Sequence, residues 1–514
     1  MTLWPAGPLN RALLTTAVAI VLGTGGYVGY DYWFAEDCAP GVAKHGPKHE
    51  CVGVTDGSFV FAPSLKQVTE RIKAENDSVA GKSPATVALM IPMISDAPAE
   101  RREYVEQVQG AYLAQYRANH QANNKQPPIR LVLANPGRGY KEWRTVADQL
   151  AQAASDKKQN LRAVAGINIS INISITETEE AVRYLTKEKG IPVVAGPMTA
   201  DDIKNTEADE YRYPGLARVA PGNTDQADAL ASYGADIKPE ETLVVEDVRE
   251  GDNYLTSLRQ TFQKLAKGAP NAPETFRSPP DFNDEGNLAN DFHQMVPDIC
   301  TSAAKTVYFA GRPVQLRQFL VELGNRTCNK PYTVISGSHA STLTVDEKFA
   351  DQWDALTKGA GITVRYAALA HPGAWGADST AATGGSKAAL KELTDLAQKL
   401  GTKEPDSMGS VDLSDGRVII TYDAVTTAVA GIRNNAVGDV KMPSLSDVTA
   451  GWLRLHGNNR VEGASGWICL DKYGNPYNKT VSIVHLNPVK KAADFDGIAW
   501  PASRAPDANC SIPN

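Results

Sequence analysis

The chain of 514 residues lacks the motifs with which common enzymes hold cofactors or activate nucleophiles. It has no glycine-rich phosphate loop, no nucleophile elbow and no metal-binding pair of histidines on a predicted helix, and its eight histidines are scattered. It also lacks an excess of basic residues, because the net charge is -7 with acids and bases interspersed. We therefore expect a protein that is not an enzyme, needs no cofactor and has no nucleic-acid partner.

Charged residues are missing from one long segment near the N-terminus, Ala12 to Tyr30. Its length is about that of a membrane-spanning helix. Arg11 precedes the segment and Asp31 follows it, which predicts a cytoplasmic N-terminus and an extracytoplasmic remainder. A cleaved signal peptide is the alternative, but the bulky residues from Tyr30 to Phe34 do not resemble a cleavage site. We therefore interpret residues 1–35 as a cytoplasmic N-terminus with a single-pass anchor in the cytoplasmic membrane.

Cysteine is rare, and its six residues fall into three local pairs. An even count beyond a membrane anchor indicates disulfides. The expected pairs are Cys38 with Cys51, Cys300 with Cys328, and Cys469 with Cys510. A zinc site formed by Cys38, His45, His49 and Cys51 is the competing interpretation of the first pair. Residues 36–83 are accordingly predicted to form a disulfide-closed extracytoplasmic linker.

From Pro84 onward, short apolar runs alternate with amphipathic stretches, which is typical of βαβ units and parallel sheets. In a first block, strands are predicted at 86–94, 129–134, 161–167, 191–195 and 216–220, with helices at 99–120, 140–154 and 176–188. In a second block, strands are predicted at 242–247, 306–310 and 332–336, with helices at 253–266 and 314–323. The fold class is therefore α/β, with two doubly wound parallel-sheet lobes.

The C-terminal part of the chain gives a weaker pattern. Tyr422 to Asn434 is predicted to be helical. Gly463 to Leu470 and Val481 to Leu486 alternate like two antiparallel strands around a turn at Lys472 to Asn475.

The order of these elements resembles the type I periplasmic-binding-protein fold, the fold of leucine/isoleucine/valine-binding proteins and of receptor ligand-binding domains. The resemblance covers about Pro84 to Leu486. It depends on four pieces of sequence: Pro197, Thr199, Asp201 and Asp202 after the fourth strand; ARVAP ending the fifth; TYDAVTTAV from Thr421; and VEGASGWICLDKYGNP from Val461.

The resemblance implies two lobes joined by three chain crossings. Lobe one would comprise residues 84–220 plus 373–455, and lobe two residues 221–372 plus 456–514. Both later disulfides would then lie within lobe two. Each lobe would present the carboxyl ends of its strands and the N-termini of its helices to a shared cleft, which suits an anionic or polar ligand.

On lobe one, the resemblance assigns a ligand carboxylate to the hydroxyl and N–H of Thr199, with the carbonyl of Pro197 beside it. The alternative is that Thr199 only caps a helix. It also places a ligand-binding residue after the third strand, where Asn168 and Ser170 stand. The sequence INISINIS there also fits a simple continuation of the strand.

On lobe two, Asp252 and Tyr254 follow a strand at a position where the family often has an aromatic residue over the ligand. A helix cap at Asp252 and a core position for Tyr254 are the alternative. Ser338 and His339 stand where amino-acid binders of the family tend to have a carboxylate for the ligand ammonium. Histidine cannot supply a permanent negative charge, so an amino-acid ligand is in doubt.

These observations predict a membrane-anchored extracytoplasmic solute-binding protein that captures a small polar or anionic ligand. Its partner would be a membrane permease, as in ABC transporters, or a signalling protein for which it acts as a sensor. A protein-interaction ectodomain whose cleft has lost its ligand is the alternative function.

Overall fold

The computed structural model describes residues 37–120, 126–167, 175–209, 212–234, 237–280, 284–375, 384–402, 405–436, 438 and 441–512. The predicted membrane helix lies outside these residues. Among the residues described, no helix is both long enough and apolar enough to cross a bilayer.

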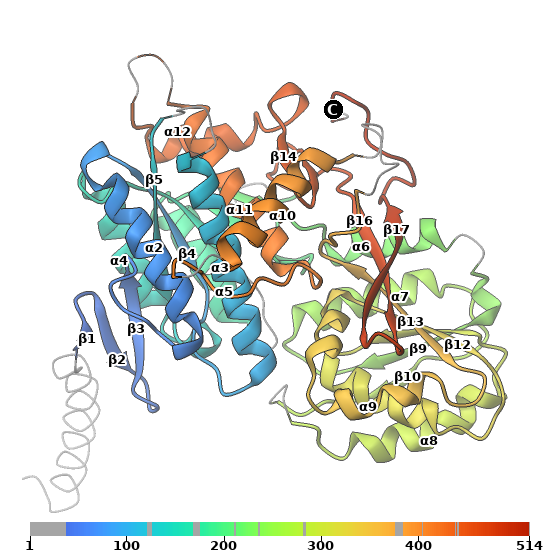
Figure 1. Cartoon of the computed structure of the whole chain (residues 1–514). Coiled ribbons are helices and arrows are strands. Elements are labelled where there is room, and N and C mark those ends of the chain that lie inside the picture. Colours follow the sequence, from blue (N-terminus) through green and yellow to red (C-terminus); the bar gives the residue numbers. More distant parts are fainter. Residues whose placement is uncertain are drawn as a thin grey trace, which may run out of the picture.

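Two sheets, each with helices packed against it, form two lobes that lie side by side (Figure 1). The first sheet has the strand order β1-β2-β3-β5-β4-β6-β7-β8. Its strands from β4 to β8 are parallel, while β1 to β3 form an antiparallel edge. The bounds are β1 (Asp37–Ala39), β2 (Val42–His45), β3 (Glu50–Thr55), β4 (Ala85–Met90), β5 (Ile129–Asn135), β6 (Leu161–Gly166), β7 (Val193–Ala195) and β8 (Leu216–Arg218).

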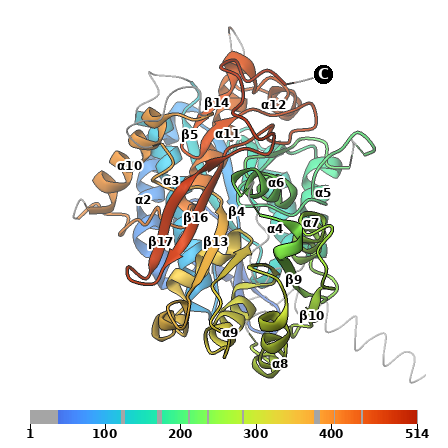
Figure 2. The same cartoon turned by 90° about the vertical axis from the view of Figure 1, so that its right-hand side faces the viewer.

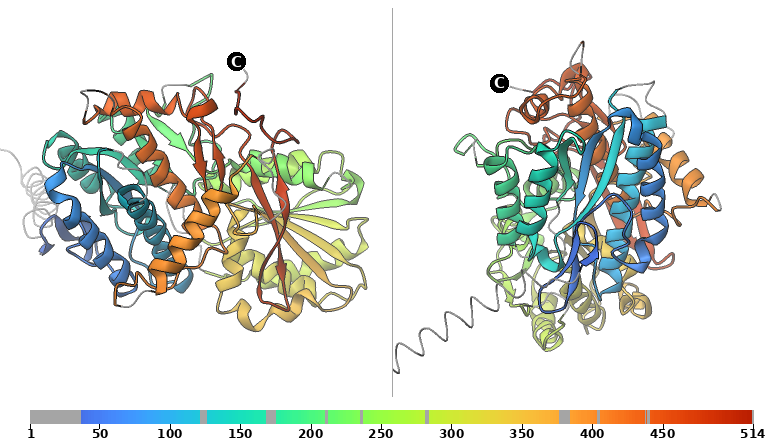
Figure 3. Two further views of the ribbon diagram at one scale, coloured as in Figure 1. Left: turned by 45° about the horizontal axis from the view of Figure 1, so that its top comes forward. Right: turned by 90° about the vertical axis from the view of Figure 1, so that its left-hand side faces the viewer.

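Helices cover both faces of the first sheet (Figure 3). Along β4, Val87 and Leu89 enter the core on one face, and Ala88 and Met90 enter the core on the other. The four residues from Val87 to Met90 are therefore all apolar, as expected for a strand that is buried on both sides. The covering helices are α2 (Lys66–Val79), α3 (Pro98–His120), α4 (Trp143–Ser155), α5 (Ile175–Arg183), α10 (Lys387–Thr402), α11 (Arg417–Arg433) and α12 (Leu445–Trp452).

The prediction that residues 36–83 form a linker is wrong. Strand β3 pairs with β5, where Val54 lies opposite Ala134. Helix α2 buries Val68 and Ile72 in the core of the first lobe. The segment belongs to the first lobe because its apolar side chains complete that core.

Close contact between α3 and α11 depends on a glycine. A Cβ atom at Gly110 of α3 would lie 2.5 Å from the carbonyl oxygen of Val418 in α11. Any larger residue would push the two helices apart. This contact fixes the N-terminal end of α11 beside α3, which matters for the site described below.

The second sheet has the order β10-β9-β11-β12-β13-β16-β17. Its first five strands are parallel, and β16 and β17 add an antiparallel edge beside β13 (Figure 2). The strands are β9 (Thr242–Asp247), β10 (Glu274–Phe276), β11 (Thr306–Ala310), β12 (Tyr332–Ser336), β13 (Ile362–Ala368), β16 (Val481–Asn487) and β17 (Ala492–Ala499). The helices are α6 (Asn223–Tyr233), α7 (Asn253–Leu265), α8 (Leu288–Thr301) and α9 (Pro313–Gly324). The α/β fold class with mainly parallel sheets is confirmed.

The predicted hairpin in the C-terminal part is wrong. Strand β15 (Gly466–Ile468) pairs with β14 (Val461–Gly463), whereas β16 pairs with β13 and β17. The β14–β15 hairpin packs on α11, where Asp423 accepts hydrogen bonds from the N–H groups of Ala464 and Ser465, each at 2.8 Å. Residues 461–470 therefore lie against the first lobe and not in the second sheet.

The three predicted disulfides are confirmed. Cys38–Cys51 joins β1 to β3, Cys300–Cys328 joins α8 to the loop before β12, and Cys469–Cys510 joins the β14–β15 region to the C-terminal segment. The first bond occupies both sulfur atoms of the alternative zinc site, so that alternative does not apply.

Candidate functional site

A cleft of about 1070 Å³ lies between the two lobes. One wall comes from the residues between β4 and α3 and from the loop after β5. The other wall comes from the loops after β9 and β10, the start of α9, and the 3-10 helix η6 (Ser338–Val345). All these segments follow the carboxyl ends of parallel strands, which is where open α/β sheets bind ligands.

The cleft walls carry both signs of charge. On the first lobe, Arg138 forms ion pairs with Asp96 and Glu50. On the second lobe, Arg317 forms ion pairs with Glu285 and with Asp346, the latter at 3.1 Å.

Three further groups on these walls have polar atoms for which the described residues supply no hydrogen-bond or ion-pair partner. Lys141 on the first lobe and Arg277 on the second are exposed to the cleft and have no carboxylate within 4.0 Å among the described residues. The hydroxyl of Ser278 is buried at the cleft wall and has no hydrogen-bond partner there either. Each lobe thus offers to the same space a cation that has no ion pair with the described residues.

The structure does not place the predicted ligand residues on these walls. None of Pro197, Thr199, Asp252, Tyr254, Ser338 and His339 lines the cleft. Asn168 and Ser170 lie outside the described residues.

Four of the predicted residues do come together, however, around an arginine that sequence reasoning missed. Arg312 donates from Nη2 to Asp252 Oδ1 at 2.9 Å and from Nε to Asp252 Oδ2 at 3.0 Å. Its Nη1 lies 2.9 Å from His339 Nδ1, and its guanidinium lies over the ring of Tyr254, 4.6 Å from the centroid. Ser338 stands next to His339 and is also buried. We call Asp252, Tyr254, Arg312 and His339 the Arg312 cluster.

Asp252 and Tyr254 have the structural roles given above as the alternative interpretation. Asp252 caps α7 by accepting a hydrogen bond from the N–H of Leu255 at 3.1 Å. Tyr254 is buried and stacks on His339 with a centroid distance of 4.3 Å. Burial raises the pKa of Tyr254 to about 12. Burial and the charge of Arg312 hold the pKa of His339 well below its ordinary value, so its imidazole is neutral.

Thr199 lies in an irregular segment, and no helix begins there. The helix-cap alternative is therefore wrong. Thr199 is buried, and its carbonyl accepts a hydrogen bond from the N–H of Asn223 at 2.8 Å. The side chain of Asn223 donates to the hydroxyl of Ser257 at 2.6 Å and to the carbonyl of Tyr254 at 3.2 Å. The segment that holds Pro197 and Thr199 is thus joined to the second lobe through Asn223.

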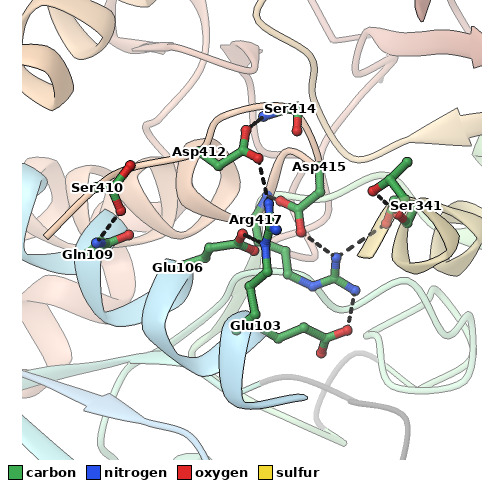
Figure 4. A network of polar contacts seen from close by, with 11 residues as sticks. Glu103, Glu106, Gln109, Ser341, Ser410, Asp412, Ser414, Asp415 and Arg417 are labelled. Atoms are coloured by element: carbon green, nitrogen blue, oxygen red, sulfur yellow. Dashed lines mark hydrogen bonds and ion pairs between the residues drawn. The ribbon is translucent and has the colours of Figure 1, made fainter. Parts of the chain in front are cut away.

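A second buried arginine, Arg417, crosses between the lobes (Figure 4). It begins α11 and donates to Glu103 of α3 at 2.6 Å and to Asp415 at 2.8 Å, both in the first lobe. It also donates to the hydroxyl of Ser341 in η6 of the second lobe at 3.2 Å. Arg417 is only 4% exposed and Glu103 only 3%. We call Glu103, Glu106, Asp415, Arg417 and Ser341 the Arg417 cluster.

Two carboxyl groups in the Arg417 cluster have shifted pKa values. Burial and the neighbouring charge of Asp415 raise the pKa of Glu106 well above its ordinary value. Burial opposes ionisation of Asp415 as well, but Arg417 and hydrogen bonds outweigh it and lower the pKa of Asp415. Glu106 is therefore the member of the pair that keeps a proton.

The two arginines had only weak sequence signals. Arg312 stands between a buried strand and a proline that starts a helix, and Arg417 follows Asp415 and Gly416 at the start of α11. A cation beside a predicted strand end or helix start could have been marked as a candidate. Its partners could not, because Glu103 lies 314 residues before Arg417.

Comparison with known proteins gives a likeness of fold. No family model matches the chain, and no curated protein does. A leucine-binding protein, LivK, from Thermotoga maritima MSB8 is similar with a TM-score of 0.55 and 16% identity, covering 81% of this chain and 99% of its own. The branched-chain amino acid transporter substrate-binding protein LivJ from Streptococcus pneumoniae, in complex with isoleucine, has a TM-score of 0.54 and 16% identity, covering 80% and 99%.

A third solved structure, an ABC transporter substrate-binding protein from Desulfitobacterium hafniense in complex with Leu, has a TM-score of 0.54 and 14% identity, covering 80% of this chain and 100% of its own. The class that the fold defines is therefore the type I periplasmic-binding-protein fold, as the sequence resemblance predicted. This chain has two lobes, each built on one large sheet, and a cleft that both lobes line.

Proposed function

We propose that this protein is a solute-binding protein without catalytic activity, which captures a small polar or anionic molecule between its two lobes. The interlobe cleft carries the proposal, because both lobes line it and each contributes a cation, Lys141 or Arg277, that forms no ion pair with the residues the structure describes. The buried hydroxyl of Ser278 supports the same site, since a polar group without a partner favours a ligand that supplies one.

The similar solved structures support a binding role, and two of them are complexes with leucine or isoleucine. In this chain Asp252 and His339, which the resemblance assigns to the ligand, contact Arg312 instead and do not line the cleft. We therefore propose that the ligand lies farther out, against Lys141, Arg277 and Ser278, and that it is not a branched-chain amino acid.

We further propose that the protein acts outside the cytoplasmic membrane and is anchored to it through the segment Ala12 to Tyr30. Three disulfides support an oxidising compartment. Delivery to a permease or sensing for a signalling protein would both use the same closure of the lobes.

A second candidate is a scaffold that binds proteins instead of a solute. The Arg417 cluster favours it, because Arg417 joins the two lobes by donating a hydrogen bond to Ser341. A scaffold would keep its lobes in one arrangement.

A thermal-melt screen of the full-length protein in detergent against polar metabolites separates the two candidates. A ligand present at one hundred times its dissociation constant should add about 2.7 kcal/mol to the free energy of unfolding. A panel of acids, amino acids, sugars and nucleosides that produces no shift would contradict the solute-binding proposal and favour the scaffold.

A pair of charge-reversal variants tests the location. We expect Arg277→Glu to weaken binding of the screened ligand at least about tenfold. Lys387→Glu changes the charge equally at an exposed position of α10 away from the cleft, and should leave the affinity unchanged. Equal affinities in both variants would remove Arg277 from the site.

A further inference from the structure

A second cavity, of about 420 Å³, lies apart from the interlobe cleft and shares no lining residue with it. It is bounded by residues 201–207, the end of β8, the start of α6, residues 471–478 and residues 501–502. Its size falls within the range of small-molecule sites. We call it the Arg218 pocket.

Arg218, the last residue of β8, is a buried cation that forms no ion pair within the described part of the chain. Its side chain lines the pocket although it is only 2% exposed. Nη2 donates to the carbonyl of Met198 at 2.9 Å, but Nε donates to no acceptor in the described part of the chain. No carboxylate lies within 4.0 Å of the guanidinium there. A buried guanidinium usually has a carboxylate beside it, so this one calls for an acceptor from elsewhere.

Three aspartates line the same pocket, and backbone hydrogen bonds fix each of them. Asp201 accepts from the N–H of Thr224 at 2.9 Å, and Asp225 accepts from the N–H of Gly222 at 3.1 Å. Asp471 accepts from the N–H groups of Tyr473 at 2.9 Å and Asn475 at 2.8 Å. These bonds hold the carboxylates in place around the pocket. Among the described residues, the positive charges near them are Lys204, 3.7 Å from Asp201, and the guanidinium of Arg218, which attracts all three carboxylates although it forms no ion pair with them.

The pocket offers an unused donor and an excess of carboxylates. A simple anion could accept a hydrogen bond from Nε of Arg218 but would be repelled by Asp201, Asp225 and Asp471, and a simple cation would be attracted by the aspartates but would leave Nε without an acceptor. A molecule that carries both charges satisfies both groups.

We propose that the Arg218 pocket binds a small zwitterion, whose carboxylate receives hydrogen bonds from Arg218 and whose ammonium group lies among Asp201, Asp225 and Asp471. The Arg218 pocket and the interlobe cleft share no lining residue, so a zwitterion could bind in the pocket whether or not a solute binds in the cleft.

Isothermal titration of the full-length protein with unbranched ω-amino acids, from glycine to 6-aminohexanoate, tests the charge requirement. We expect at least one member to bind. The carboxylate and the amine of the same chain length, each carrying one charge, should bind at least about tenfold more weakly. Equal binding of either singly charged compound, or no heat with any member of the series at its solubility limit, would overturn the proposal.

Variants then locate the bound zwitterion. Asp471→Asn and Arg218→Gln should each lower the affinity for the zwitterion at least about tenfold. Asp351 is exposed and lies outside both cavities, so Asp351→Asn should leave the affinity unchanged. Because Arg218 is buried, its variant is first checked for a native melting curve. If Arg218→Gln does not fold, the affinity of Asp471→Asn for the zwitterion tests the location.

Arg277→Glu separates this proposal from the one for the cleft. Binding that is lost in Arg277→Glu but kept in Asp471→Asn would place the zwitterion in the interlobe cleft. That result would overturn the Arg218 pocket and leave the proposed function standing.

Discussion

The two buried arginine clusters differ in what they hold together. Every member of the Arg312 cluster belongs to the second lobe, so this cluster stabilises one lobe internally. The Arg417 cluster contains residues of α3 and α11 from the first lobe and Ser341 from the second. An arginine side chain therefore stabilises the interior of one lobe at position 312 and forms a contact between the lobes at position 417.

This difference indicates that the two arginines form more contacts within a lobe than between the lobes. Both arginines are almost fully buried and hydrogen-bonded to carboxylates. Across to the other lobe, however, the described part of the chain shows one hydrogen bond from Arg417, which its charged guanidinium donates to the hydroxyl of Ser341 at 3.2 Å. A hydrogen bond with one charged partner contributes about 1.5–3 kcal/mol, which is less than the loss expected when a buried ion pair is broken.

The largest expected effect is that of Arg417→Met. The change removes the guanidinium from two buried carboxylates, Glu103 and Asp415, so we expect the free energy of unfolding to fall by about 3–5 kcal/mol. Urea denaturation measures the loss, and hydrogen exchange should increase in both α3 and η6. Exchange that increases in the first lobe alone would contradict the role of Arg417 as a contact between lobes.

We expect Arg312→Met to have a somewhat smaller effect, about 3 kcal/mol. Asp252 loses Arg312 but keeps Arg249, which donates to it at 2.6 Å. Hydrogen exchange should increase only in the second lobe, near α7 and η6. An increase of the same size in α3 would show that the two clusters are coupled and would remove the contrast between them.

The control for both variants is Arg183→Met. Arg183 forms an exposed ion pair with Glu188 at 3.3 Å. Exposed pairs contribute at most about 1 kcal/mol, so this variant measures the cost of the substitution itself. A loss as large as that of Arg417→Met would show that burial is not the cause.

The smallest expected effect is a change of pH dependence in Glu106→Gln. The pKa of Glu106 is raised, so above its ordinary value of 4.5 the folded state holds a proton that the unfolded state releases. The contribution of Glu106 to the free energy of unfolding is therefore present below that value and is lost as the pH rises. Glutamine cannot lose a proton, so as the pH rises above 4.5 the free energy of unfolding of the variant should fall less than that of the native protein.

Urea denaturation at several pH values measures this difference, with Glu240→Gln at an exposed position as the control. Identical pH profiles for the native protein and Glu106→Gln would show that Glu106 is ionised in the folded state.

The sequence predicted the second sheet well for a physical reason. Strands Thr242–Asp247, Thr306–Ala310 and Tyr332–Ser336 have the predicted bounds, because short apolar runs between helices report burial directly. The alternation around Val481 correctly indicated a strand but not its partner. Pairing depends on contacts that a local pattern does not contain, so β16 lies between β13 and β17 and not beside β15.

The site was harder to predict than the fold. The resemblance named Asp252, Tyr254, Ser338 and His339 as ligand-binding residues, and in the structure they lie in one neighbourhood. It could not show that Arg312 fills this neighbourhood, or that the open space lies farther out beside Arg277. Whether a strand end binds a ligand or another side chain depends on long-range packing, and the sequence shows no direct sign of it.

The central claim, that a solute binds between the two lobes, is tested most directly by a crystal structure of the protein grown with the compound that shifts its melting curve most. We predict electron density for that compound in the interlobe cleft, within hydrogen-bonding distance of Arg277 or Ser278. Density for it elsewhere, with the cleft holding only solvent, would contradict the account.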